Sequence, residues 1–462
     1  MNSKPGRDAS GTTPMERIRP RPITRAARRD DTGDDRGGGA RTGPPCAAGT
    51  GFRAATEPIR NEIPRNGARV PEPKRLLVVL GSLGAGGSER QVIEIVRGLD
   101  RSRFLPSLFL VYRSGPLLAE VPGDVPVFAF AEAPMEPSPF HIPGGILWAQ
   151  GRALARCVRD LDIDILYDRT SQMALTAYLA GRPRATARVS VAAGDPAGEF
   201  ATAHHRFGRF KKILLRRAYR DADRVIAVST GVARGLGSFY GLPSERIAVC
   251  PNLFDVDRID ALAAAETPER RAEHFRIVTV GRLQEEKGHI VLLEAIRRLV
   301  HGEGRTDIRL WLIGEGPSER TLRAFAAANR LEPFVAFLGR RANPLPWVRS
   351  ADLFCLPSRY EGMPNALVEA MLCGTPIVAT DCPSGPREIL ADGAYGTLVA
   401  PDRPEDLARA IGQARQDDAD RRRVARAARR HAVEAYSARK GLVRLESALD
   451  EALATRRACR TS

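Results

Sequence analysis

The sequence predicts an α/β protein built from two doubly wound parallel sheets, and three observations support this fold class. Short apolar runs alternate with helical stretches between residues 74 and 250, and a second series of the same kind runs from 275 to about 400. A glycine-rich turn joins the first apolar run to an amphipathic helix, as in the opening unit of a doubly wound domain. The polar stretch TPERRAEHF separates the two series.

This alternation gives the domain organisation. Residues 1–73 are rich in Arg, Gly, Pro and Asp, so they bury too little apolar surface to offset the entropy of ordering and are predicted to form a disordered basic tail. We expect a first Rossmann-like domain over 74–255, a linker over 256–274 and a second Rossmann-like domain over 275–435. The Arg- and Ala-rich residues 436–462 are predicted to be helical.

Composition limits the partners and the compartment. The net charge of +16 favours an anionic partner, which can be a nucleic acid, an acidic membrane surface or a phosphorylated substrate. A specific nucleic-acid partner is not expected, because no recognition motif is present and the aromatic residues do not interleave with basic ones. Without an apolar run of the ~20 residues that span a bilayer, or a secretory signal, a cytoplasmic location is expected. The seven cysteines form no C-x-x-C pair and are predicted to be reduced core residues.

The glycine-rich turn LGSLGAGGSER excludes two common phosphate-binding motifs. It lacks the Gly-Lys-Ser/Thr of a Walker A loop. Gly84 and Gly86 fit the dinucleotide fingerprint G-x-G-x-x-G, but Glu89 stands where the third glycine belongs. This mismatch argues against an NAD-dependent oxidoreductase.

The most informative stretch, Pro357 to Leu390, contains two glutamates that are separated by seven residues, Glu361 and Glu369. Because Pro is favoured at the first position of a helix, Pro364 predicts a helix that begins near Met363 or Pro364. Glu361 then precedes the helix at the mouth of a site, and Glu369 lies inside it, about two turns on from Glu361, where it can accept hydrogen bonds from a sugar hydroxyl.

The start of this helix predicts a phosphate site. The first amides of a helix point their N–H groups outwards at the positive end of the helix dipole, which favours a bound anion. The amides expected at this position belong to Gly362, Met363 and Asn365.

The same stretch resembles the retaining glycosyltransferases of family 4, whose mark is EGxPxxxxE followed by A-x-x-G-x-P. EGMPNALVE runs here into Ala370, Gly374 and Pro376, and the combined string is much more specific than the spacing of the two glutamates. The resemblance covers about 75–435. It implies the GT-B arrangement, in which two Rossmann-like domains face each other across a cleft. The first domain would bind the acceptor, the second would bind the nucleotide sugar, and the helix within 436–462 would return to the first domain.

The resemblance also implies roles for individual residues. Gly86 and Gly87, in a G-G-x-E-R string, would lie against the donor phosphates, and Arg282 and Lys287 would grip the diphosphate in place of a metal ion. From the residues alone, this Arg and Lys can also be a surface pair. Gly339 and Arg340 would face the base. Glu369 would hold the ribose, while Glu361 would orient the sugar or stabilise its developing positive charge. The predicted donor site therefore comprises Gly86, Gly87, Arg282, Lys287, Gly339, Arg340, Gly362, Met363, Pro364, Asn365 and Glu369.

The first domain departs from the family pattern at one strand end. Many relatives carry a His or an Arg-Asn-Asp-Pro group there, where this chain has Ala192 to Pro196. Asp195 is either the polar group that takes the catalytic role of those residues or a turn residue before Pro196.

Residues 206–220 predict a basic amphipathic helix. Phe207, Phe210, Leu214 and Ala218 share one stripe, and Arg209, Lys212, Arg216 and Arg220 face the other way. Such a helix can lie in an anionic membrane interface, or it can pack on the sheet and present a solvated basic face. His204 and His205 are predicted to be solvent or hinge residues, because no metal-binding partner lies at ligand spacing.

By resemblance, the expected function is transfer of a hexose or N-acetylhexosamine from a nucleotide sugar, with retention, to a hydroxyl of a lipid-linked or polysaccharide acceptor in cell-envelope glycan synthesis. The string Ser384-Gly385-Pro386-x-Glu388 is similar to a subgroup that uses UDP-linked sugars. No cofactor and no metal are expected. The protein would be cytoplasmic, with a possible peripheral position on the inner face of the plasma membrane. The alternatives are a nucleotide-sugar epimerase of the same fold and a basic nucleic-acid-binding protein.

Overall fold

The computed structural model describes residues 72–133, 144–202, 208–265 and 273–461, all within one compact unit. All but the last two residues of the predicted tail 1–73 lie outside the described residues, as do His204, His205, Arg206 and Phe207.

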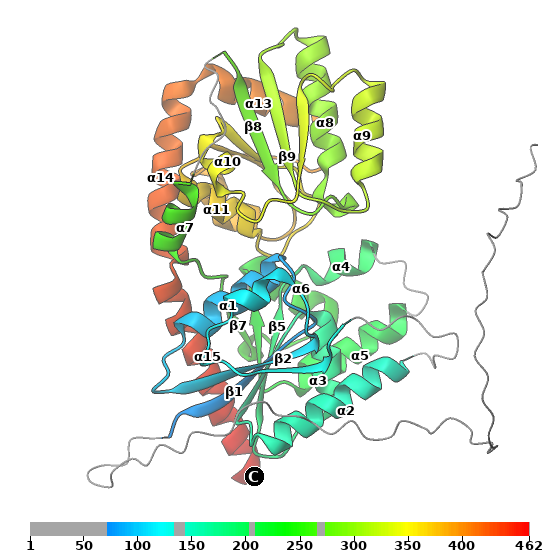
Figure 1. Cartoon of the computed structure of the whole chain (residues 1–462), viewed down its shortest axis with the longest axis vertical. Coiled ribbons are helices and arrows are strands. Elements are labelled where there is room, and N and C mark those ends of the chain that lie inside the picture. The colour runs from blue at the N-terminus through cyan, green and yellow to red at the C-terminus, as the bar shows by residue number, and fades with distance from the viewer. Residues whose placement is uncertain (1–71, 134–143, 203–207, 266–272, 462) are drawn as a thin grey trace, which may run out of the picture. The chain divides into compact units, whose positions relative to one another are not determined.

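The first lobe is a parallel sheet covered by helices (Figure 1). Its strand order is β3-β2-β1-β4-β5-β6-β7, and every strand pair is parallel. The strands are β1 (Lys74–Leu80), β2 (Phe104–Tyr112), β3 (Val127–Ala131), β4 (Ile165–Arg169), β5 (Ala187–Ala192), β6 (Arg224–Ala227) and β7 (Ile247–Val249). The helices are α1 (Gly87–Gly98), α2 (Gly145–Asp160), α3 (Ser171–Ala180), α4 (Pro196–Thr202), α5 (Gly208–Asp221) and α6 (Thr230–Tyr240), with short 3-10 turns at Pro116–Glu120 and Ser244–Arg246.

The second lobe repeats the plan with the strand order β10-β9-β8-β11-β12-β13. Its strands are β8 (Phe275–Val280), β9 (Ile308–Ile313), β10 (Val335–Gly339), β11 (Leu353–Leu356), β12 (Ile377–Thr380) and β13 (Thr397–Val399). Its helices are α8 (His289–Arg297), α9 (Glu319–Ala328), α10 (Leu345–Ser350), α11 (Asn365–Cys373), α12 (Pro386–Ile389), α13 (Pro404–Gln416) and α14 (Asp418–Tyr436). Two 3-10 turns lie at Glu285–Lys287 and Ala391–Gly393, and a π-helical turn follows α8 at Arg298–Gly302.

The strand orders confirm the predicted fold class and show where ligands should bind. In each sheet the order reverses beside the first strand, between β1 and β4 and between β8 and β11. Open α/β sheets bind ligands outside the carboxyl ends of the strands at such a reversal. The segments that leave β1, β8 and β11 are those that carry Gly86–Gly87, Arg282–Lys287 and Glu361.

Two segments cross between the lobes side by side. Phe254 and Ser437 form a parallel bridge, with the Phe254 N–H 3.0 Å from the Tyr436 carbonyl oxygen and the Ala438 N–H 2.8 Å from that of Phe254. Helix α15 (Ala438–Thr461) then packs against β5 and β6 of the first sheet. Within the segment predicted to be a linker, α7 (Val256–Ala263) is helical and packs against α10 and α11 of the second lobe.

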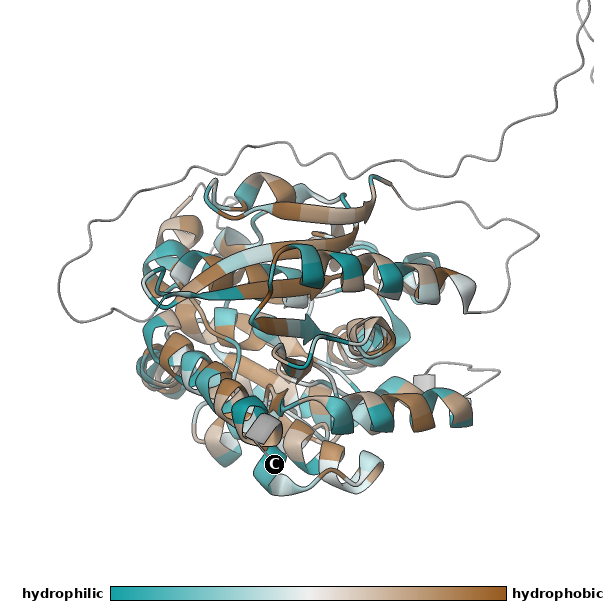
Figure 2. Cartoon of the chain, turned by 90° about the horizontal axis from the view of Figure 1, so that it is seen from below, coloured by the Kyte–Doolittle hydropathy of each residue, from teal (hydrophilic) through white to brown (hydrophobic). Residues whose placement is uncertain are grey.

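The core consists of the apolar strands and the inner faces of the helices. The strands are mostly coloured as hydrophobic in Figure 2, while the surrounding helices alternate hydrophobic and hydrophilic residues. Cys157, Cys250, Cys355 and Cys382 are buried free thiols, and Cys373 is partly buried. The prediction that the cysteines are core residues is wrong for Cys459, which is exposed near the end of α15, and Cys46 lies outside the described residues.

Candidate active site

The start of α11 presents free amides, as the sequence predicted. The helix begins at Asn365 with Pro364 at its N-cap, so Glu361 precedes it and Glu369 lies inside it, as predicted. No side chain caps the helix, and the N–H groups of Gly362, Met363 and Asn365 donate to no acceptor among the described residues. This end of the helix therefore offers unsatisfied donors and a positive dipole to an anion.

A cation and a carboxylate that are far apart in the sequence meet beside this helix. Lys287 Nζ donates to Glu361 Oε1 at 2.7 Å, and the Ser358 hydroxyl donates to the same oxygen at 2.7 Å. Glu361 is 8% exposed, so its charge is held mainly by these two donors. The contact depends on Gly288, whose φ is +63° and where a Cβ atom would lie 2.0 Å from the Pro357 carbonyl oxygen. The loop that carries Lys287 can therefore pack directly on the end of β11.

The other predicted basic residues of the second lobe are exposed. Arg282 follows β8 and makes no ion pair with a described residue, so it is available to a ligand. Arg340 follows Gly339 at the end of β10, and its guanidinium lies 3.6 Å from the carboxylate of Glu315. The predicted cations are thus spread along the carboxyl ends of β8 and β10, and only Lys287 is paired with Glu361.

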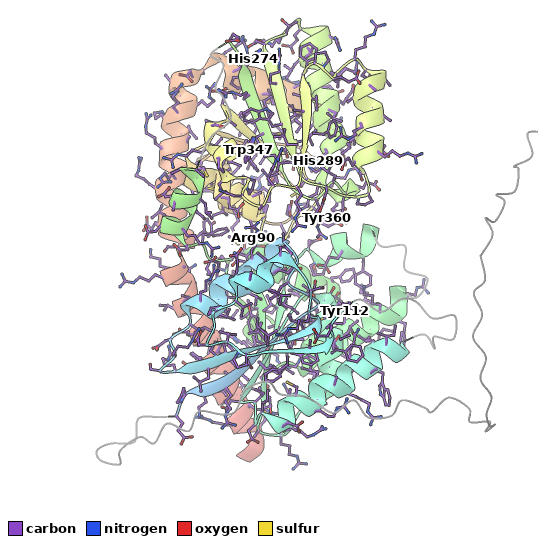
Figure 3. The ribbon with its side chains drawn as sticks, viewed as in Figure 1. Arg90, Tyr112, His274, His289, Trp347 and Tyr360 are labelled. Carbon is purple, nitrogen blue, oxygen red and sulfur yellow. The ribbon has the colours of Figure 1, made fainter. Side chains whose placement is uncertain are left out.

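The first lobe brings its glycine turn to the start of α11. The Asn365 side-chain amide donates to the Gly87 carbonyl oxygen at 3.2 Å, and Asn252 donates to the Asn365 side-chain oxygen at 2.7 Å. Gly86 is the N-cap of α1, and Arg90 of the same helix, labelled in Figure 3, donates to the Ala342 carbonyl oxygen at 3.1 Å. Two helix starts predicted to face the donor phosphates, those of α1 and α11, therefore lie together.

Glu369 has a perturbed acidity. Burial raises the pKa of its carboxyl, and the positive charge of Arg90 opposes this shift. Because Arg90 comes from the first lobe and Glu369 from the second, their interaction depends on the two lobes remaining together. Arg90 is noted in the sequence only as part of the G-G-x-E-R string, and its spacing from Glu369 gave no signal of this interaction.

Further contacts between the lobes lie at α6. The Ser229 hydroxyl donates to the Gly362 carbonyl oxygen at 2.9 Å and caps α6 through the Val232 N–H. The backbone N–H and the hydroxyl of Thr230 donate to Glu388, at 2.8 and 2.6 Å. Glu388, the acid of the Ser-Gly-Pro-x-Glu string, is therefore engaged in a contact between lobes.

Asp195 has the geometry of a turn residue. It is 7% exposed, and its carboxylate accepts a hydrogen bond from the Gly198 N–H at 2.7 Å at the start of α4. A second acid of this loop, Glu199, was not singled out in the sequence. It lies on α4, where burial raises the pKa of its carboxyl and the Ser171 side chain lowers it. The only sequence signal for Glu199 is its position four residues after Asp195, on the same short helix.

Helix α5 buries only part of the predicted apolar stripe. Its buried residues are Leu215, Ala218 and Tyr219, while Phe210 is 62% exposed. Within the stripe, Leu214 and Ala218 pack on the core, so the alternative in which the stripe packs on the sheet is wrong only for Phe210 among the described residues. Lys212 was assigned to the basic face, but its Nζ lies 3.6 Å from the centroid of the Phe239 ring.

The described residues contain no group of three or more His, Cys, Asp or Glu side chains placed to hold a metal ion. Nor do they include a helix with the length and apolar character that a bilayer crossing requires.

Two family models match the chain. Residues 274–417 match "Glycosyl transferases group 1", and residues 85–258 match "Glycosyltransferase Family 4", so together they cover more than half of the chain.

Curated relatives match over part of their length. The chain is 30% identical over 207 residues, 45% of its length and 54% of the relative's, to the N-acetylgalactosamine-N,N'-diacetylbacillosaminyl-diphospho-undecaprenol 4-alpha-N-acetylgalactosaminyltransferase of Campylobacter jejuni. It is 31% identical over 209 residues, 45% of its length and 58% of the relative's, to the lipopolysaccharide core biosynthesis glycosyltransferase LpsE of Rhizobium meliloti. The chain thus spans about half the length of these relatives.

The fold has solved counterparts. The Anabaena protein HepE, crystallised in complex with UDP, has a TM-score of 0.64 at 22% identity over 82% of this chain and 99% of HepE. This likeness concerns the fold alone. One family model matches the first lobe and the other matches the second, and each lobe is built on a parallel Rossmann-like sheet, as in GT-B neighbours. The chain belongs to the family 4 (group 1) glycosyltransferases.

Proposed function

We propose that this protein is a retaining glycosyltransferase that moves a hexose or N-acetylhexosamine from a UDP-linked donor to an acceptor hydroxyl. The observation that carries the proposal is the Lys287–Glu361 pair beside the free amides at the start of α11, outside the strand-order reversal of the second sheet. The site combines positive charge for a diphosphate with a carboxylate for the sugar. HepE, which has the same fold, was crystallised with UDP, and this supports the choice of nucleotide.

In the proposed reaction, the acceptor oxygen forms a bond to the anomeric carbon while the bond from that carbon to the diphosphate breaks. Negative charge develops on the departing diphosphate, and Lys287, Arg282 and the amides of α11 stabilise it. Glu361 orients the sugar or stabilises the positive charge on its ring. The acceptor proton passes to the departing phosphate, so no separate base is needed. Because two cations neutralise the diphosphate, we propose that no metal ion is required.

The rest of the donor is assigned by position. Glu369, whose carboxyl pKa is raised by burial, would hold the ribose hydroxyls by hydrogen bonds. Gly339 and Arg340, at the end of β10, would face the base. Gly86 and Gly87 would approach the phosphates from the first lobe.

The acceptor is proposed to be lipid-linked or a polysaccharide, in the synthesis of a cell-envelope glycan. The names of the two relatives support this class, since one acts on a diphospho-undecaprenol compound and the other belongs to lipopolysaccharide core biosynthesis. The acceptor would bind to loops of the first lobe, outside the carboxyl ends of β4 and β5.

The test of this proposal is a screen of nucleotide sugars by thermal shift, followed by a product assay. A UDP-linked sugar should raise the melting temperature, because a ligand that binds only the folded state stabilises it by mass action. Product should then form only when an acceptor is added, and its new linkage should retain the anomeric configuration of the donor. Conversion of the nucleotide sugar without an acceptor would instead identify an epimerase.

We also propose that α5 places the protein on an anionic membrane surface at the cytoplasmic face. Phe210 and Ile213 are 62% and 50% exposed, and Arg209, Arg216 and Arg217 are exposed on the same helix. Exposed apolar groups flanked by arginines are typical of helices that lie in an anionic interface.

Vesicle sedimentation tests this proposal. The variant Phe210→Asp/Ile213→Asp should lower the fraction bound to phosphatidylglycerol vesicles by at least about tenfold, because it replaces apolar contacts with negative charge. Val443→Asp, at a site on α15 that is 65% exposed, is the matched control and should bind like the wild type. Equal binding of the double variant and the wild type would reject the role of α5.

A further inference from the structure

The carboxyl ends of β4 and β5 hold an acid that the proposed mechanism leaves unused. Strands β4 and β5 are neighbours, so the chain that follows each of them reaches the same edge of the first sheet. Ser171 is the first residue of α3, directly after β4, and Glu199 lies on α4, directly after β5. The Ser171 side chain lowers the pKa of the Glu199 carboxyl, which burial raises. This acid therefore lies beside the strand-order reversal of the lobe proposed to bind the acceptor.

Close backbone contacts bring the segment that carries this acid against the residue that follows Glu361. At Gly194, a Cβ atom would lie 2.3 Å from Glu199 Oε1, so the carboxylate lies directly over this glycine. At Gly362, a Cβ atom would lie 2.1 Å from the Ala193 carbonyl oxygen and 2.8 Å from the Gly194 Cα. The chain next to Glu361 therefore touches the glycine that Glu199 covers.

A second contact supports the same placement. Tyr360, labelled in Figure 3, lies against α4, because a Cβ atom at Gly198 would be 2.6 Å from the Tyr360 ring. Tyr360 and Gly362 are the sequence neighbours of the catalytic candidate Glu361. Tyr360 packs on α4, which carries Glu199, and Gly362 packs on the loop before α4. Glu199 belongs to the first lobe and Glu361 to the second. The residues on both sides of Glu361 touch the segment of the first lobe that carries Glu199.

The surroundings of Glu199 favour a role in binding. Its side chain is partly accessible, unlike that of Asp195, which is buried and caps α4. Burial raises the pKa of the Glu199 carboxyl, the Ser171 side chain and the charge of Lys211 on α5 lower it, and the charge of Asp195 raises it. Burial is the main cause of the raised pKa of the Tyr219 phenol on α5 and of the Tyr240 phenol on α6, and the charge of Glu199 raises both further. A partly desolvated carboxylate accepts hydrogen bonds more strongly than a fully hydrated one.

We infer that Glu199 accepts a hydrogen bond from the acceptor hydroxyl and holds its oxygen toward the donor sugar. The inference rests on the proposed function, which it deepens by assigning the acceptor-binding group of the first lobe. Asp195 then acts only as the cap that fixes the direction of α4. Ser171 and Lys211 act as positioning residues, because each opposes the rise in the Glu199 pKa that burial causes.

The test uses the full chain, UDP-glucose or UDP-N-acetylglucosamine as donor, and octyl glycosides and water as probe acceptors. Attack by water releases the sugar and UDP, so donor consumption can be followed even when no octyl glycoside is a substrate. Glu199→Gln should lower both transfer and hydrolysis by at least about tenfold, since a hydrogen bond to a charged group is replaced by one to a neutral amide. Its melting temperature, its UDP-induced thermal shift and its donor KM should stay at wild-type values. Glu245→Gln, an exposed acid of the same lobe, is the matched control and should keep full activity.

A pH profile separates binding from a structural role. Wild-type activity should fall at acid pH as the Glu199 carboxylate is protonated. The Ser171 side chain and the Lys211 charge both lower this pKa, so Ser171→Ala or Lys211→Met should raise it and move the acid limb to higher pH. The activity of Glu199→Gln should not show this fall at acid pH.

Three results would overturn the inference. Glu199→Gln with wild-type rates and an unchanged acid limb would show that the acid does not contact the acceptor. A parallel loss of UDP binding would show that it serves the donor or the fold. Wild-type protein that consumes no UDP-sugar with any of these acceptors would contradict the proposed function, and the inference would fall with it.

Discussion

Replacing Lys287 by Met is expected to lower kcat/KM about a hundredfold, which corresponds to about 2.7 kcal/mol of transition-state stabilisation. Lys287 Nζ lies 2.7 Å from Glu361 Oε1 and beside the free amides of α11, so it is the cation best placed to neutralise the departing diphosphate. Its removal also leaves the Glu361 carboxylate nearly buried without its counter-charge, which is costly in itself. Steady-state kinetics with a UDP-sugar measures the loss.

Two further variants make the Lys287 result specific. Lys287→Arg keeps the charge but changes its geometry, so it should recover part of the activity. Lys440→Met removes an exposed lysine of α15 and should leave kcat/KM unchanged. Wild-type activity in Lys287→Met would remove this lysine from the mechanism.

Replacing Glu361 by Gln is expected to lower kcat about a hundredfold while changing the KM for the donor much less. The carboxylate is assigned to charge that develops on the sugar ring in the transition state, and the loss of such an interaction lowers kcat. The amide oxygen of Gln can still accept hydrogen bonds from Lys287 and Ser358, so the site should keep its shape. Measurement of kcat and KM under the same conditions separates the two effects.

Controls for this variant use the contact with Lys287. Glu434→Gln changes an exposed acid of α14 and should be fully active. Because Lys287 and Glu361 touch, the double variant should lose less activity than the sum of the two single effects in free energy. A Glu361→Gln enzyme with unchanged kcat, or with a loss confined to the donor KM, would contradict the assigned role.

The sequence predicted the fold because its local and long-range signals agree. The two series of apolar runs, over 74–250 and 275 to about 400, contain the strands of the two sheets, since buried parallel strands are continuous apolar segments. The reversal of strand order explains why the residues after β8 and β11 gather, although they are far apart in the sequence. Pro364 marked the start of α11 within two residues, because its missing N–H is tolerated only at a helix start.

Contacts between lobes could not be predicted from the sequence. Lys287 and Glu361 are 74 residues apart, and nothing local to either residue indicates that they bond. The approach of Gly362 to Ala193 depends on how the lobes pack, as does the interaction of Arg90 with Glu369. Glu199 was missed for the same reason, because its significance comes from its neighbours in space, Ser171 and Gly194.

The burial of the α5 stripe could be predicted only in part, for a different reason. The helical wheel grouped Phe210 with Ala218, but the structure buries Ala218 together with Leu215 and Tyr219 and leaves Phe210 in solvent. Periodicity identifies which residues share a face, and it does not determine which face the sheet covers when aromatic residues occur on both.

We expect the start of α11 to bind the diphosphate of a nucleotide sugar through Lys287, Arg282 and backbone amides, without a divalent cation. Calorimetric titration of UDP into the full chain in the presence of EDTA tests it most directly. We predict saturable binding to one site per chain, with an affinity that falls at least about tenfold in Lys287→Met. Absence of binding under these conditions, or binding that appears only when a divalent cation is restored, would contradict the account.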